Sequence, residues 1–116
     1  MAGRGGRQQL FYALADPTRR IIIELLATHG QMSATSIYGN FSVSHPAISQ
    51  HLGVLREAEL VTVEKDAQRH LYGLNPRGMR ELEAWVDRTT KLWEERFERL
   101  DEVLEKEKRK SARRGK

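Results

Sequence analysis

The sequence contains no cysteine in its 116 residues. This absence excludes disulfide bonds, thiolate ligands for metals and thiol-based redox sensing. The chain also lacks long apolar runs, since no stretch approaches the roughly 20 residues that a membrane-spanning helix needs. Residues 1–7 are rich in glycine and arginine and contain no apolar stretch of the kind that forms a secretory signal. We therefore expect a cytoplasmic protein that has no membrane partner.

The middle of the chain has little positive charge. The formal net charge is +4, but residues 9–105 contain 11 Lys and Arg against 15 Asp and Glu, so the positive excess lies at the ends. We expect a disordered basic arm at 1–6, one folded domain at 7–105 and a basic tail at 106–116. The tail is either a solvated end or a source of sequence-independent attraction to phosphate groups.

Catalytic and metal-binding patterns are also missing. Ser49 and His51 are the nearest approach to a nucleophile and its base, but residues two apart on a helix do not face each other. The histidines are not paired with one another or with carboxylates at ligand spacing on one helix face; they are His29, His45, His51 and His70. We expect no enzyme activity, no cofactor and no transition-metal site.

Capping residues predict a series of helices. Asp16 is followed by proline, which is typical of a helix start, and Ser33 and Ser44 are the next N-cap candidates. A short helix at 34–39 and a longer one at 44–57, joined by a short turn, form a helix-turn-helix pattern.

Two runs in which side chains alternate between the two faces of a strand follow at 61–64 and 70–74, and a polar stretch separates them. This pattern predicts a β-hairpin whose tip carries Lys65 and Arg69. A hairpin that follows a helix-turn-helix is a wing. The predicted fold is therefore mainly α with a small β-hairpin, a winged helix-turn-helix of about five helices and a two-stranded wing.

Pro76 and Gly78 are expected to break the chain before a long last helix from about Met79 to Lys106. Its apolar residues recur at spacings of three and four, as in a coiled coil of roughly three heptads. We interpret this stripe, together with the first helix, as a homodimer seam; intramolecular packing and a small-ligand pocket are the alternatives. The predicted seam residues are Leu10, Phe11, Leu14, Leu82, Trp85, Thr89, Trp93, Phe97 and Leu100.

The helix that begins at Ser44 has a small, polar outward face, which is what entry into the major groove of DNA requires. Gln50 can pair with adenine, Ser49 can bond either base type, and the Ala47 methyl can touch a thymine methyl. His51 lies between the two faces, so it either contacts DNA or is half-buried in the core. The predicted DNA contacts are Ser44, His45, Ala47, Ser49, Gln50, His51, Arg56, Lys65 and Arg69. An ordinary amphipathic helix is the alternative.

Three stretches, 13–26, 43–52 and 54–61, resemble the ArsR family of winged-helix repressors. The resemblance implies a dimer of five-helix protomers whose first and last helices build the interface. It also implies repression by DNA binding, relieved by an inducer, and it places residues 44, 45, 47 and 49–51 in the major groove. This chain departs from the family in lacking its thiolate site and the histidines of its last-helix metal site. Family members often have a basic residue at the position of Gly53, and a glycine at the wing tip where this chain has Ala67-Gln68.

We therefore expect a sequence-specific repressor that binds double-stranded DNA as a homodimer on a palindromic operator and does not sense metals. One alternative is a metal-responsive repressor with a histidine site, and another is a winged helix that binds proteins. A small-molecule inducer, if there is one, is expected to act at the aromatic seam, and control through protein abundance is the alternative.

Overall fold

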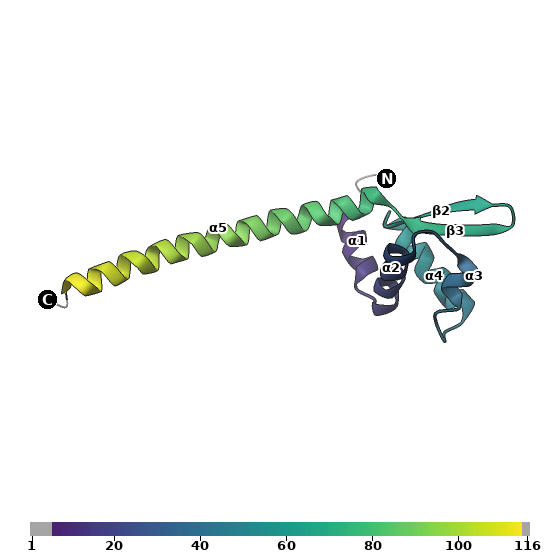
Figure 1. Cartoon of the computed structure of the whole chain (residues 1–116), viewed down its shortest axis with the longest axis horizontal. Coiled ribbons are helices and arrows are strands. Elements are labelled where there is room, and N and C mark those ends of the chain that lie inside the picture. The colour runs from purple at the N-terminus through teal and green to yellow at the C-terminus, as the bar shows by residue number, and fades with distance from the viewer. Residues whose placement is uncertain (1–5, 115–116) are drawn as a thin grey trace. The chain divides into compact units, whose positions relative to one another are not determined.

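The computed structural model describes residues 6–114, which form two units, one up to Leu82 and one from Glu83 onward. The elements are α1 (Gly6–Leu14), α2 (Pro17–His29), β1 (Met32–Ser33), α3 (Ala34–Tyr38), α4 (His45–Glu57), β2 (Val61–Asp66), β3 (Arg69–Leu74) and α5 (Pro76–Arg114) (Figure 1). The fold is mainly helical with a small antiparallel sheet, as predicted. Of the predicted arm, only Gly6 lies within the described residues, and it begins α1.

The helices start where the capping residues predicted. The Asp16 carboxylate accepts a hydrogen bond from the Arg19 backbone N–H at 3.1 Å, and proline occupies the first turn of α2. Ser33 accepts from the Ser36 N–H at the start of α3, and Ser44 accepts from the Ala47 N–H at the start of α4. Each side chain satisfies a donor that the helix itself leaves without a partner.

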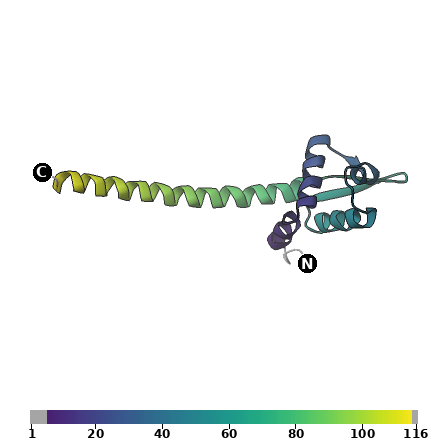
Figure 2. The same cartoon turned by 90° about the horizontal axis from the view of Figure 1, so that it is seen from below.

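The hairpin is longer than predicted, and the sheet has an additional strand. β2 and β3 pair up to Asp66 and Arg69, so only Ala67 and Gln68 form the turn, and the tip extends past the helices in both views (Figures 1 and 2). The strands extend into the polar stretch at 65–69 because both faces of this ladder are solvent-exposed and accept polar side chains. β1 adds a third strand beside β3. Its two residues are too few to show the alternation of apolar and polar side chains that predicts a strand.

One apolar core joins the helices of the first unit to the sheet. Its most deeply buried large side chains are Leu10, Ile22, Leu26, Ile37, Ile48, Leu52, Leu55, Leu60 and Val61. Three of them, Ile48, Leu52 and Leu55, come from α4, in agreement with the predicted inward stripe. The core therefore leaves the opposite face of α4 exposed to solvent.

The chain leaves α4 through a left-handed residue. Glu59 has φ of 59°, the Glu59 N–H donates to the Arg56 carbonyl, and the Leu60 N–H donates to the Leu55 carbonyl. These two hydrogen bonds form a Schellman motif, in which glycine usually occupies the left-handed position. The backbone turns here to bring Leu60 back onto the core.

The start of α5 corrects the sequence interpretation. The helix begins at Pro76, and the Asn75 side chain accepts from the Arg77 backbone N–H at 3.0 Å. Proline is compatible with a first helical position, where its missing N–H is not needed. Gly78 lies against the backbone of Glu59, and a Cβ there would collide with the Glu59 carbonyl oxygen. Gly78 therefore permits close packing and does not break the helix.

The second unit is the exposed remainder of α5. The helix continues to Arg114, past the predicted end near Lys106. The Lys, Arg and Glu residues of this segment are good helix formers, and Lys110 lies 4.0 Å from the Glu107 carboxylate one turn earlier. Within the described residues, no helix has the length and apolar character needed to cross a bilayer.

Candidate nucleic-acid interface

The outward face of α4 carries most of the side chains predicted to contact DNA. Ser44, Ser49 and Gln50 are exposed, and Ala47 is half-buried beside them. A Cβ built at Gly53 would have no atom within 4 Å, so this face is open one turn further along. No charged side chain is present on the helix before Arg56. The surface is therefore small and polar, which suits contact with base edges.

Tyr38, the last residue of α3, holds two of these predicted contact residues. Its ring stacks on the His45 ring, with centroids 4.3 Å apart and planes 14° from parallel. The Tyr38 hydroxyl lies 2.8 Å from the Ser49 hydroxyl, within hydrogen-bond distance. Tyr38 was not predicted from the sequence, because a half-exposed aromatic residue at a helix end adds nothing to an apolar stripe. Through Tyr38, the first helix of the helix-turn-helix orients side chains on the second.

His51 is held from the other side of α4. Its side chain is 24% exposed, and its Nδ1 lies 3.1 Å from Nη1 of Arg19 and 3.8 Å from Oδ2 of Asp16. Arg19 is itself buried, with 8% of its surface exposed. Of the two alternatives from sequence, the structure supports the half-buried residue, whose inner nitrogen contacts α2, and the DNA contact stays a prediction. Arg19 was not predicted from the sequence, because its partner His51 lies 32 residues away.

Opposing effects act on Asp16. Desolvation raises the pKa of its carboxyl group, but the hydrogen bond from the Arg19 backbone N–H outweighs this effect together with the His51 ring, where that ring is protonated, and the Arg19 cation. The pKa is therefore lowered from its ordinary value of 3.8. The carboxylate remains charged at neutral pH and continues to cap α2.

The wing does not bring its two predicted phosphate contacts together. Asp66 pairs with Arg69 across the strands, and Lys65 pairs with His70. Because neighbouring residues on a strand point to opposite faces, Lys65 and Arg69 lie on opposite faces of the hairpin. Arg69 also forms an ion pair with Asp66 at 3.0 Å. Lys65 and His70 share one face of the hairpin.

Arg56 lies in the last turn of α4, away from the residues that begin the helix. Desolvation raises the pKa of the Tyr72 hydroxyl, and Tyr38 acts in the same direction, while the Arg56 cation lowers it. Arg56 and Tyr38 therefore both lie near Tyr72 of β3. This places Arg56 at the junction of α4 with the sheet.

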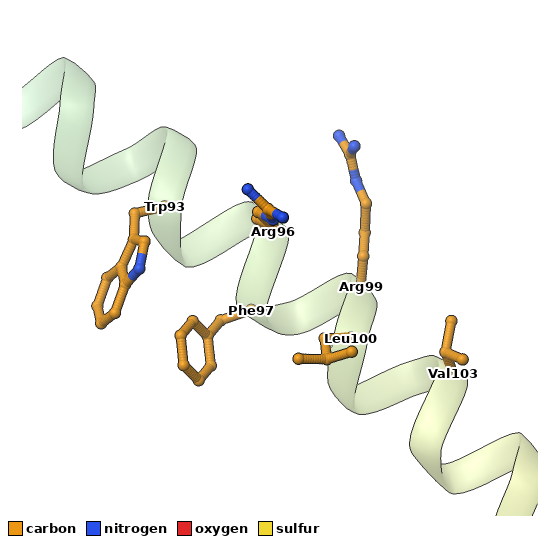
Figure 3. A pocket seen from close by; sticks show the side chains of 6 residues that line it. All are labelled: Trp93, Arg96, Phe97, Arg99, Leu100 and Val103. Carbon is orange, nitrogen blue, oxygen red and sulfur yellow. The ribbon is translucent and has the colours of Figure 1, made fainter.

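The residues of the predicted dimer seam fall into two groups. Leu10 is 1% exposed and belongs to the core of its own chain, which corrects its assignment to the seam, while Phe11, Leu14 and Leu82 pack partly against that core. On the second unit, Thr89 is exposed and Trp85 is half-buried. The remaining members project from the same side of α5 and are strongly exposed (Figure 3); they are Trp93 at 60%, Phe97 at 48% and Leu100 at 52%. Within residues 6–114, no group of three histidine or carboxylate side chains is positioned to hold a metal ion.

Comparison with known proteins identifies the family. The sequence pattern of the arsR family of bacterial regulatory proteins matches residues 16–63. An HTH-type transcriptional regulator of Mycobacterium tuberculosis is 45% identical over 76 residues, which cover 66% of this chain and 70% of that protein. The transcriptional repressor SdpR of Bacillus subtilis is 38% identical over 77 residues, which cover 66% of this chain and 84% of that protein. The chain belongs to the ArsR family.

The structural similarity to other ArsR-family proteins extends further than the sequence match. A solved structure of an ArsR-like transcriptional regulator from a Rhodococcus species has a TM-score of 0.75 at 25% identity, covering 90% of this chain and 96% of that one. The family match runs from the cap of α2 to the middle of β2, and so includes all of α4. The chain is a transcriptional regulator of the ArsR family, and it is not an enzyme.

Proposed function

We propose that this regulator is a sequence-specific repressor that binds a palindromic operator as a homodimer and does not respond to metals. The observation that carries the proposal is the exposed polar face of α4, capped by Ser44 and held by Tyr38. The name of SdpR describes a repressor, and two staphylococcal relatives are named as repressors of arsenical resistance operons.

In this proposal, α4 lies in the major groove. Gln50, Ser49 and Ala47 contact base edges, because they occupy the outward face and are short enough to enter the groove. Ser44 and His45 lie at the helix start, where backbone N–H groups favour a phosphate oxygen. Arg56, Lys65 and Arg69 add contacts to the backbone of the duplex. Since Lys65 and Arg69 face opposite ways, each contacts a different phosphate.

The proposed homodimer forms through the apolar stripe of α5 and the exposed surface of α1. Trp93 and Phe97 expose about half or more of their surface, and their ring centroids lie 4.7 Å apart. Such aromatic surface is costly to leave in water over several helical turns. A two-fold dimer would place its two recognition helices roughly 34–36 Å apart, one turn of DNA.

Metal independence is proposed from the chemistry of the side chains. The chain has no cysteine, and α5 has carboxylates but no histidine. Zinc, nickel and copper sites usually recruit nitrogen or sulfur ligands. If an inducer exists, we propose that it acts at the aromatic stripe of α5, the surface through which two copies of the chain would join.

The deciding experiment is selection of bound sequences from a random duplex pool. A palindromic consensus of two half-sites one turn apart supports both sequence-specific reading and two-fold symmetry. Affinity for that duplex should fall steeply with salt, because phosphate contacts release counterions. Binding without sequence enrichment would contradict the proposal, and absence of any duplex binding would favour a protein-binding winged helix. Release by stoichiometric zinc, reversed by a chelator, would contradict metal independence.

A further inference from the structure

Arg19 is a buried cation that nothing in the winged-helix pattern requires. Its Nε donates to the Ala13 carbonyl at 2.7 Å, and its Nη2 donates to the Tyr12 carbonyl at 3.0 Å. Both carbonyls belong to the last turn of α1, where a helix lacks its regular donors; the Tyr12 carbonyl also accepts from the Ala15 backbone N–H at 3.2 Å. The Tyr12 ring lies 5.2 Å from the guanidinium carbon and adds a cation–π contact. These contacts fix the plane of the guanidinium.

The remaining nitrogen of this fixed guanidinium is directed at His51. Nη1 of Arg19 lies 3.1 Å from Nδ1 of the ring. A guanidinium only donates, so Nδ1 must accept with its lone pair. A neutral imidazole that accepts at Nδ1 carries its proton on Nε2. Asp16 offers an alternative acceptor for a protonated Nδ1, but its Oδ2 lies 3.8 Å away and accepts the Arg19 backbone N–H instead.

The outer nitrogen of His51 then has a proton to donate. Within residues 6–114, no group of the protein forms a hydrogen bond with Nε2, and the side chain is 24% exposed. His51 lies on α4 between the buried stripe and the outward face that carries Gln50. Phosphate oxygens line both edges of the major groove, so a residue at the side of the recognition helix meets a phosphate before it meets a base.

We propose that Arg19 is a positioning residue that locks His51 in its Nε2–H tautomer, so that the recognition helix presents a neutral donor to a DNA phosphate oxygen. The proposal rests on the proposed function of α4. In this proposal, a buried residue of α2 sets the protonated nitrogen of a side chain on α4 that contacts DNA. Arg19 itself does not touch the DNA.

The tautomer is tested on the free protein, without DNA. Long-range proton–nitrogen NMR of the imidazole ring distinguishes a protonated Nε2 from a protonated Nδ1. At neutral pH we expect His51 to be protonated at Nε2 alone in the wild-type protein. In the Arg19→Lys variant, we expect a mixture of the two tautomers in the folded protein. A wild-type ring protonated at Nδ1 would overturn the proposal, whatever the outcome of DNA binding.

The phosphate contact is tested with two matched substitutions. His51→Asn keeps an acceptor near the position of Nδ1 but removes the outer N–H, whereas His51→Gln keeps an N–H near the position of Nε2. We expect His51→Asn to weaken binding by about 10-fold on operator and random duplexes alike, since a hydrogen bond to a charged group is lost. His51→Gln should recover most of this loss. Circular dichroism melts of both variants provide the control for folding.

The dependence of binding on salt separates a neutral donor from a charged one. Because a neutral N–H releases no counterion, His51→Asn should leave the slope of log affinity against log salt unchanged. A slope smaller by about 0.9 would show that the wild-type ring binds as a cation, and would overturn the tautomer assignment. A loss confined to the operator would show a base contact, and wild-type affinity in His51→Asn would show no contact. Either result would overturn the phosphate assignment.

Discussion

Replacing Glu59 by glycine should stabilise the protein, although glycine usually weakens structure near a helix. Glu59 occupies the left-handed position of the Schellman motif at the end of α4, with φ of 59°. A side chain at this position crowds the backbone, and glycine relieves the crowding. The Glu59 side chain contributes little in return, because its contact with Arg77 is 3.8 Å long and both groups are exposed.

The expected gain follows from two opposing effects. The left-handed conformation costs an L-residue roughly 1–2 kcal/mol. Glycine also gives the unfolded chain more freedom, an opposing effect of about 0.4–1 kcal/mol. The central values leave a net gain of about 0.8 kcal/mol, which raises the melting temperature of a domain of this size by about 3–6 °C. Thermal melts followed by circular dichroism, with urea titrations at fixed temperature, measure both quantities.

Two control variants separate the backbone effect from the side-chain effect. Glu59→Ala removes the contact with Arg77 but keeps a Cβ, so its stability should stay within about 0.5 kcal/mol of wild type. Glu57→Gly places glycine in the right-handed last turn of α4 and should cost about 0.5–1 kcal/mol. If Glu59→Gly destabilises the protein as much as Glu57→Gly does, or if Glu59→Ala stabilises it equally, the strain argument is wrong.

Four further predictions concern the proposed DNA contacts, the dimer and acid stability. Gln50→Ala should cost roughly 1–3 kcal/mol on the operator and little on random duplex, and equal losses on both would contradict base reading. Tyr38→Phe removes the hydrogen bond to Ser49 but keeps the stack, so operator affinity in filter binding should fall about 2- to 10-fold without a change in salt slope. Trp93→Glu should convert the proposed dimer to monomer in light scattering and abolish operator binding, because it would bury a charge in the proposed seam. Because the pKa of Asp16 is lowered in the folded state, the carboxylate stabilises the protein fully above the ordinary pKa of 3.8, and this stabilisation is lost as the pH falls below that value. Asp16→Asn keeps the cap but does not titrate. Urea titrations of this variant should therefore show a smaller loss of stability in acid.

Local chemistry accounts for the parts of the fold that the sequence predicted correctly. The cap at Ser44 and the apolar residues that follow it at helical spacing require only neighbouring residues, so α4 could be placed within one residue of its observed start. The same applies to Asp16 and α2. The start of α5 was misplaced because Pro76 and Gly78 were both interpreted as a break, although Asn75 before proline repeats the pattern of cap and proline that placed α2. The approach of Gly78 to the Glu59 backbone, a contact distant in sequence, accounts for the glycine in the first turn of α5.

The geometry of the candidate site depends on contacts of that distant kind. Apolar side chains on one stripe of α4 hold the helix against the core, but such packing is non-directional and tolerates small rotations of the helix about its axis. Hydrogen bonds constrain that rotation, because they weaken steeply when their angles change. Two polar contacts act in this way from opposite sides, Tyr38 with Ser49 and Arg19 with His51. Their partners are 11 and 32 residues apart, beyond the reach of any local pattern. The orientation of the polar face of α4 therefore depends on side chains of α2 and α3, and substitutions at Tyr38 or Arg19 should alter DNA binding although neither residue lies on α4.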